Sequence, residues 1–404
     1  FLKFRAGYGQ TGNSPQSYQI YPSLVAASIP LPFGSVDFPF NGISSFEISN
    51  SIANAHLKPI ITTEAELGME IHFLNNKIGL DVAVYDKKTN GQIFNVPITP
   101  SSGYTSLVQN LGLVSNKGVE IELNLKPVDS KNFTWALDYN FAKNWNKVDK
   151  LTSGLQKVTI YGLIGGVELD AIPGKSVSGI YAFGPQYTPD GKIIVNSTTG
   201  KPLQSPDRIF YGNAENDYTM GLSNNFRFKA WNFNFSLDYR KGGVFYSKTA
   251  EQLLFTGGAT PTIYNDRRPF VLPNSVVQNG TDNNGKPVYV ENTTPITESA
   301  FQDYWPENGN PALAYANDIL DRSFIKLRNI SLSYSLPNHI ASKIKANNLT
   351  LTIYSRNILL WTPAANLYID PEASNFGNDL TSQLGEFETS PTSIQFGVAL
   401  KASF

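Results

Sequence analysis

The fold is decided by the closing segment of the chain, Ile394-Gln395-Phe396-Gly397-Val398-Ala399-Leu400-Lys401-Ala402-Ser403-Phe404. Apart from Ala399, its apolar side chains all stand at even positions, and the chain stops on a phenylalanine. Successive side chains point to opposite faces of a β-strand. The segment is therefore predicted to be a strand with one apolar face and one polar face.

The composition excludes several classes of protein. The chain has 404 residues, no cysteine and a net charge of −1. Without cysteine there is no disulfide framework, thiolate metal site or cysteine nucleophile. The balanced charge argues against a nucleic-acid partner, which requires a basic face. No run of about 20 apolar residues is present, so the sequence predicts no transmembrane helix.

The same alternation recurs along the chain. In the clearest hairpin, a strand around Met220 is followed by one that begins at Trp231, and polar or charged residues occupy the opposite parity in both. Similar segments lie at 67–73, 78–84, 119–125, 133–141, 330–336 and 349–353. With the first and last segments, this pattern predicts about ten strands.

The lengths of the connections assign the two ends of the predicted sheet. Short and long connections alternate along the chain. The short ones join 73 to 78, 125 to 133, 230 to 231 and 336 to 349; the long ones join 9 to 62, 85 to 112, 145 to 217, 240 to 322 and 361 to 392. Short periplasmic turns and long extracellular loops are typical of an outer-membrane β-barrel. A closing strand that ends on an aromatic residue is also typical of such barrels.

The sequence thus predicts an all-β fold of about ten antiparallel strands from an outer-membrane barrel. In the closing strand, Phe396, Val398, Leu400 and Phe404 are predicted to face lipid, and Lys401 to face the lumen. Aromatic residues are enriched where a membrane protein meets the interface. Trp361 and Phe404 are accordingly predicted to be membrane-interface aromatics.

Short motifs that suggest chemistry have structural explanations. Residues 7–12 match G-x-G-x-x-G, but Asn13-Ser14-Pro15 follows where a dinucleotide site requires a helix, so we interpret the motif as a strand end entering a loop. Asp282-Asn283-Asn284-Gly285 lacks the closing glutamate of a calcium loop and is interpreted as a tight turn. The three histidines share no metal-binding spacing. No catalytic residue, metal site or cofactor is expected.

Charged side chains recur at the inward parity. They are Glu66, Glu70, Asp81, Glu120, Glu122, Asp138, Arg227, Lys229, Arg240 and Lys401. Such a set suits a catalytic or ion-conducting site, or the lining of a wet lumen that grips an internal plug. The second interpretation is favoured, because opposite signs occur on several strands.

Aromatic residues in the long loops are the best ligand-binding candidates. Phe301, Tyr304 and Trp305 lie close together in one loop. Flat rings stack on sugar faces or enclose peptide side chains with little loss of entropy. Packing within the loops or at the membrane interface explains the same residues equally well.

Several longer stretches follow one another along nearly the whole chain. They are Phe4–Asn13, Glu64–Glu70, Val84–Thr89, Asn116–Leu123, Phe141–Val148, Phe324–Tyr334, Arg356–Thr362 and Asp370–Glu372. Together they resemble the C-terminal half of a SusC-like (SusC/RagA family) TonB-dependent outer-membrane transporter of Bacteroidota. The resemblance implies part of a plugged barrel of the 22-stranded class. It also implies TonB-driven import of oligosaccharides or peptides beneath a SusD-like lid lipoprotein.

Residues 1–404 would then be the C-terminal portion of such a barrel. No plug, TonB box or signal peptide is recognised in them, and ten strands cannot close that barrel, so we expect a part of a longer polypeptide. The expected partners are the SusD-like lipoprotein, TonB through the missing N-terminal part, the lipid bilayer and lipopolysaccharide, and no nucleic acid. No enzymatic activity is expected. The alternative is a SusC-like barrel that serves as a scaffold subunit of a larger outer-membrane complex, because no stretch of the loops defines a ligand pocket.

Overall fold

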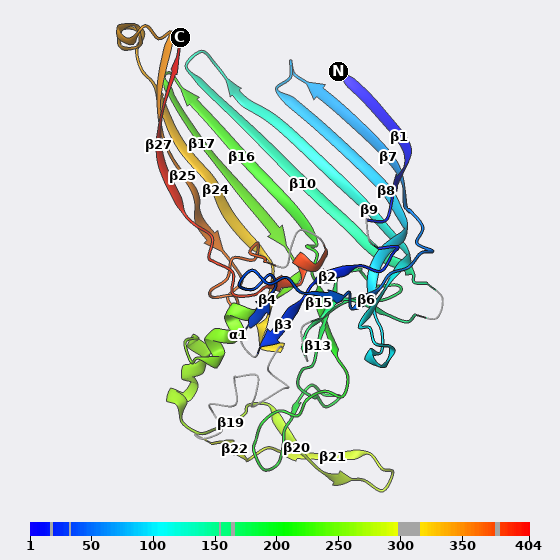
Figure 1. The fold of residues 1–404 in the computed structure, drawn as a ribbon. Coiled ribbons are helices and arrows are strands. Elements are labelled where there is room, and N and C mark those ends of the chain that lie inside the picture. Colours follow the sequence, from blue (N-terminus) through cyan, green and yellow to red (C-terminus); the bar gives the residue numbers. More distant parts are fainter. Residues whose placement is uncertain (17–18, 32–33, 153–154, 163–165, 298–315, 376–379) are drawn as a thin grey trace.

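One antiparallel sheet dominates the computed structural model, which describes residues 1–404 except 17–18, 32–33, 153–154, 163–165, 298–315 and 376–379. Its order is β1-β7-β8-β9-β10-β16-β17-β24-β25-β27, and the short β6 pairs with β9 in parallel. Figure 1 shows these strands side by side, with both chain ends at the short-turn end of the sheet and the long connections at the other. The predicted set of about ten antiparallel strands is confirmed.

We call these ten strands the wall. They are β1 (Leu2–Asn13), β7 (Ile60–Phe73), β8 (Ile78–Pro97), β9 (Ser106–Asp129), β10 (Phe133–Lys150), β16 (Tyr218–Phe228), β17 (Trp231–Lys241), β24 (Phe324–Ser335), β25 (Asn348–Trp361) and β27 (Gln395–Ser403). Most neighbours along the wall are also neighbours in sequence, as expected for hairpins.

The register of the wall brings the apolar parities of its strands together. One row of paired residues crosses nine strands: Phe4, Met69, Val82, Ile121, Phe141, Met220, Tyr239, Ile325 and Trp361. Along β27, Val398 pairs with Ile353 and Leu400 with Leu351, whereas Lys401 pairs with Thr350 on the opposite face. Val398 is 71% exposed and Phe396 is 73% exposed. An apolar face that no other layer covers is what a lipid-facing wall requires.

The hairpin of β8 and β9 corrects one predicted connection. Residues 85–112 were expected to form a long loop, but β8 continues to Pro97 and β9 already begins at Ser106. The extension is missed by periodicity because Asp86, Lys87 and Lys88 are polar at both parities. A strand that leaves the membrane has water on both faces, so the two-residue alternation is no longer needed.

Two smaller expectations are also corrected. The glycine motif 7–12 lies inside β1, which runs to Asn13, rather than at a strand end. Lys229 does not point inward from a strand, since β16 ends at Phe228 and Lys229 adopts a positive φ of 51° in the two-residue turn before β17. The interpretation of residues 282–285 as a turn is confirmed, because the Asp282 carboxylate accepts the backbone N–H groups of Asn284 and Lys286.

The long connections 14–59, 98–105, 151–217, 242–323 and 362–394 form what we call the loop layer. Its strands are β2 (Leu24–Ala26), β3 (Ser28–Leu31), β4 (Gly34–Asp37), β5 (Phe46–Ile48), β6 (Ser51–Ile52), β11 (Val158–Gly162), β12 (Glu168–Ala171), β13 (Gly179–Ala182), β14 (Ile193–Ile194), β15 (Ile209–Asn213), β18 (Val244–Ser247), β19 (Phe270–Val271), β20 (Ser275–Thr281), β21 (Pro287–Glu291), β22 (Pro295–Ile296), β23 (Ile319–Asp321) and β26 (Gly385–Glu386). These strands form small sheets such as β11-β12-β13-β15 and β23-β18-β26.

Helices are short. They are η1 (Pro100–Ser102), α1 (Lys248–Phe255), η2 (Thr260–Arg267), η3 (Ala316–Asp318) and η5 (Leu380–Gln383) in the loop layer, and α3 (Asn338–Ala341) and η4 (Ser342–Ile344) between β24 and β25. Ser247 caps α1 by accepting the backbone N–H of Ala250. None of the helices in the described part of the chain has the length and apolar character needed to cross a membrane.

The loop layer has a buried apolar core of its own. Its main cluster combines Val167, Leu169, Ile180, Ala182, Ala214, Tyr246 and Leu384. These residues come from three different connections, and each is at most 1% exposed. These three connections therefore pack together as one folded layer at the end of the wall rather than as separate loops.

Candidate functional site

The connection between β25 and β27, residues 362–394, is bound to the inward face of the wall by charged side chains. We call this connection the strap. The wall contributes Arg240 from β17 and Lys326 and Arg328 from β24, and the strap contributes Asp370 and Glu372. We call these five residues the clamp.

Lys326 is the centre of the clamp. Its Nζ atom lies 2.6 Å from Asp370 Oδ2 and 2.7 Å from Glu372 Oε2, and the residue is only 1% exposed. Thr392 donates a further hydrogen bond to Asp370 from the far end of the strap. A buried ammonium is tolerated only when it is paired and hydrogen-bonded, as here.

A β-bulge lets two basic residues of β24 reach the same carboxylates. Leu237 pairs with Leu327 and Ser236 with Asn329, so Arg328 is an extra residue in the ladder. Such bulges redirect side chains next to functional sites. Arg328 Nη1 lies 2.5 Å from Glu372 Oε2, and Arg328 Nη2 lies 2.5 Å from Asp238 Oδ2 on the adjacent strand.

The positive charge around Glu372 lowers the pKa of its carboxyl group. Burial alone would raise the pKa of its carboxyl, but the hydrogen bonds from Arg328 and Lys326 outweigh burial and hold that pKa at about 2, below the ordinary 4.5. Arg240 Nη2 adds a contact of 2.8 Å to Glu372 Oε1. An acid whose pKa is lowered by folding contributes stability that is complete above its unfolded value and is lost as the pH falls through the folded value. The clamp is therefore at full strength above about pH 5 and weakens towards about pH 2.

A pocket of about 410 Å³ opens beside the strap. Its lining includes Thr249, Leu360, Tyr368, Asp370, Glu386 and Thr392. Glu386 is 1% exposed and accepts hydrogen bonds from the Ser247 and Thr249 hydroxyls at 2.5 and 2.8 Å. Hydroxyls, carboxylates and an aromatic ring around a pocket of this size suit a small polar solute. No group of three or more residues suitable for a metal ion is present in the described part of the chain.

The inward face nearer the short-turn end carries a second set of ion pairs. Arg5 donates two hydrogen bonds of 2.7 Å to Asp81, and Glu70 bonds the imidazole of His72 at 3.0 Å. Arg5 was not predicted, although it shares the inward parity of Lys3 and lies one strand from Glu70. The bidentate Arg5–Asp81 contact and the Glu70–His72 hydrogen bond indicate that the charged residues on this part of the wall hold one another in place.

Two inward tyrosines lie flat on the wall. Tyr85 pairs with Gly118 and Tyr354 with Gly397, and a Cβ atom at either glycine would lie within 2.4 Å of the tyrosine ring. Glycine in a strand often marks such a close approach, and an aromatic ring laid over it restores the lost packing. Because these rings lie along the strands, they occupy less of the space enclosed by the wall.

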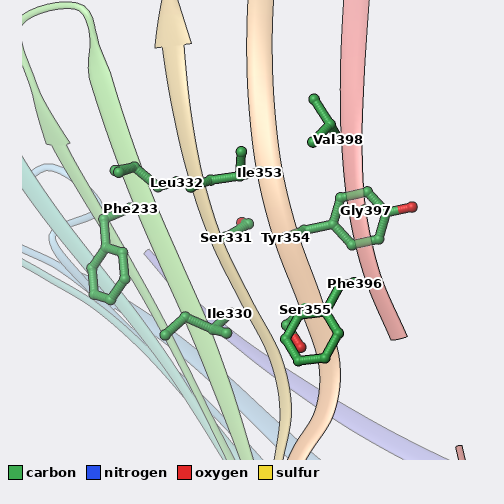
Figure 2. Close-up of a pocket in the computed structure, with 10 residues that line it drawn as sticks. All are labelled: Phe233, Ile330, Ser331, Leu332, Ile353, Tyr354, Ser355, Phe396, Gly397 and Val398. Carbon is green, nitrogen blue, oxygen red and sulfur yellow. The ribbon is translucent and has the colours of Figure 1, made fainter. Parts of the chain in front are cut away.

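On the outward face, a groove of about 560 Å³ runs across β17, β24, β25 and β27. Figure 2 shows its lining, in which Ser355 lies beside Phe396 and Ile330, and Phe233 and Ile353 line the groove further along. The groove belongs to the apolar face that the register aligns across the wall, so we assign it to contact with lipid rather than to a solute site.

The predicted site residues fall in different places. Phe301, Tyr304 and Trp305 lie outside the described residues, so their role in ligand binding stays a prediction. Trp361 ends β25 at the loop-layer end and is 50% exposed. Phe404 follows β27 at the short-turn end and is 78% exposed. The interfacial role of these two aromatics also stays a prediction.

The clamp was missed by sequence reasoning, although its residues stood in recognised stretches. Lys326 and Arg328 lie in one of them, and Asp370 and Glu372 form another. A usable signal was the pair of basic residues on a strand that carries no acidic residue of its own. The fold and its inward ion pairs define this chain as a wall segment of an outer-membrane β-barrel.

Comparisons with known proteins agree with this class. Residues 1–191 match the family model described as TonB dependent receptor-like, beta-barrel. The chain is 27% identical to TonB-dependent receptor P3 of Formosa agariphila, over 93% of this chain and 36% of that protein. It is 28% identical to TonB-dependent receptor SusC of Bacteroides thetaiotaomicron, over 58% of this chain and 24% of that protein. The structure of the RagAB peptide transporter matches 100% of this chain and 41% of that chain, with a TM-score of 0.66 and 20% identity.

These matches show that the chain is similar to TonB-dependent receptors, SusC among them, and that residues 1–191 resemble their β-barrel domain. The chain spans little more than a third of the length of the P3 receptor.

Proposed function

We propose that this chain is the C-terminal part of an active importer that takes oligosaccharides or peptides across the outer membrane. The observation that carries the proposal is the clamp, which fixes the strap and its pocket across the inward face at the loop-layer end of the wall. A solute that enters between the long loops would meet this pocket before it reaches the space enclosed by the wall. The family and the likeness to SusC support the same direction of transport.

The rest of the machinery is proposed from the family. Residues 1–404 would supply part of the barrel, while a plug and a TonB-binding segment would be supplied elsewhere in the longer protein. A SusD-like lipoprotein would cover the loop layer, and TonB would provide the energy. Phe301, Tyr304 and Trp305 are proposed to add aromatic contacts to the solute.

The test uses the full-length protein in its native host together with the lipoprotein gene. Deletion of the full-length gene is expected to abolish growth on one oligosaccharide or peptide mixture as the limiting nutrient, and the intact gene is expected to restore it. A copy without its TonB-binding segment serves as the control and should fail to restore growth. Undiminished growth of the deletion strain on every nutrient tested would reject the proposal.

Co-purification separates import from the scaffold alternative. An importer is expected to bring down the lid lipoprotein together with bound oligosaccharide or peptide, detected by mass spectrometry. Stable recovery of other outer-membrane subunits, with no bound solute, would favour the scaffold.

A further inference from the structure

The short-turn end of the wall is strongly basic. Its four turns, with the last residues of β9, comprise residues 74–77, 126–132, 229–230 and 336–347, and they contain six lysines and one acidic residue, Asp129. The lysines are Lys77, Lys126, Lys131, Lys229, Lys343 and Lys345, and all six are exposed. We call this set the basic rim. In the loop layer the balance is reversed, because acidic residues outnumber basic ones there.

The link between β24 and β25 folds towards the membrane side of the wall. Its residues Ala341 and Ala346 pack with Leu349 and Leu336. Leu349 pairs with Ala402 at the parity of Leu351 and Leu400, which is the outward, apolar parity. The link is the short coiled ribbon beside the C-terminus in Figure 1.

This link leaves two isoleucines uncovered. Ile340 is 37% exposed and Ile344 is 50% exposed, and a spacing of four residues places them on one side of a helical turn. Lys343 and Lys345 flank Ile344 directly. Apolar residues next to lysines on a short amphipathic segment are typical of a segment that lies in a membrane interface.

Exposed aromatic residues also lie at the short-turn end of the wall, beside the turn between β16 and β17. Phe228 is 51% exposed and Trp231 is 46% exposed, on either side of the turn that holds Lys229. Lys229 Nζ lies 5.4 Å from the Phe228 ring centre. At the short-turn border of the apolar face, lysines therefore lie among exposed apolar side chains rather than apart from them.

We propose that the basic rim and the link 336–347 bind anionic phospholipid headgroups of the periplasmic leaflet of the outer membrane. The apolar face of the wall fixes the height of the bilayer, and the rim lies where that face ends, at the level of the headgroups. Lysines at such a level attract anionic lipid within about one Debye length. Ile340 and Ile344 would enter the boundary of the acyl region while Lys343 and Lys345 remain at the phosphates.

The experiment uses the full-length protein in detergent, incubated with equal amounts of phosphatidylglycerol and phosphatidylethanolamine of matched acyl chains. Native mass spectrometry then counts retained lipids. The wild-type protein is expected to retain several-fold more phosphatidylglycerol. Salt at about 0.5 M, where the Debye length is about 4 Å, should reduce that preference when it is added before exchange. The variant Lys343→Glu/Lys345→Glu is expected to lose most of it, and Lys343→Gln/Lys345→Gln about half.

The control variant is Lys192→Glu/Lys286→Glu, which makes the same charge change at two exposed lysines of the loop layer. It is expected to keep the wild-type preference. Heat-modifiable mobility on gels shows that each barrel is folded before lipids are compared. Equal retention of the two lipids by the wild-type protein, or the same loss in the control as in the rim variant, would overturn the proposal. Recovery of an acidic periplasmic protein by the rim, without any lipid preference, would overturn it as well.

Discussion

The wall and the loop layer place their apolar side chains in opposite ways. In the wall, Phe396 and Val398 are 73% and 71% exposed, whereas Leu169 and Ile180 in the loop layer are both 0% exposed. The wall meets lipid, so its apolar residues face outward, and the loop layer meets water, so its apolar residues form a core. One chain thus exposes its apolar residues where it meets lipid and buries them where it meets water.

Charged side chains contribute to the stability of the wall from its inward face. On the inward face, charged residues hold one another in pairs, and the clamp joins the strap to the wall. We therefore expect the same type of substitution to change the stability of the protein by different amounts in the wall and in the loop layer. Each of the following tests uses unfolding of the full-length protein by urea in phospholipid vesicles.

Removal of the clamp lysine is expected to have the largest effect. Lys326→Ala leaves the buried Asp370 carboxylate without its cation, which costs about 4 kcal/mol, whereas Glu372 keeps Arg240 and Arg328. The strap should then be cleaved faster by added protease. In Lys326→Met/Asp370→Leu, apolar groups replace the pair and Glu372 keeps Arg240 and Arg328, so most of the stability should return. Equal destabilisation by both variants would show that the charges are not what holds the strap.

Truncation of an apolar side chain should distinguish the regions next. Ile180→Ala opens a cavity in the loop-layer core and is expected to cost about 3 kcal/mol. Val398→Ala removes methyl groups that face lipid, which can fill the gap, so less than about 1 kcal/mol is expected. Similar losses at both positions would break the comparison.

A charge placed on either face of β24 tests the orientation of the wall. Leu332→Arg puts a guanidinium on the lipid-facing side and should cost about 2 kcal/mol or more, depending on its depth. Ser331→Arg places the same group on the inward face, where a much smaller loss is expected. The reverse ranking would mean that the faces have been assigned incorrectly.

Glu215 in the loop layer should give the smallest effect. Burial raises the pKa of its carboxyl. An acid with a raised folded pKa costs nothing at low pH, begins to destabilise as the pH rises past its unfolded value, and reaches its full cost above the folded value. Glu215→Gln is therefore expected to raise the unfolding midpoint slightly at pH 8 and not at pH 4. Glu388→Gln, at an exposed position of the strap, serves as the control and should change neither.

Periodicity was sufficient to predict the strands that cross the membrane. The apolar row from Phe4 to Trp361 has the predicted parity on the other strands, but in β24 the bulge at Arg328 shifts the parity, so the row passes through the odd-numbered Ile325. It failed for residues 86–97, because a strand with water on both sides needs no alternation. Periodicity also did not predict the loop-layer core, where Leu169, Ile180 and Leu384 meet from connections far apart in the chain.

The sequence by itself determined the ten strands, their faces and the end of the wall that bears the long connections. These features are local, because a two-residue period and the length of a connection can be read without knowing what lies nearby. Only the tertiary structure decided that Lys326 and Arg328 meet Asp370 and Glu372, some 44 residues further along the chain. The ion pairs depend on a bulge in β24 and on the path of the strap, and neither feature produces a periodic pattern in the sequence.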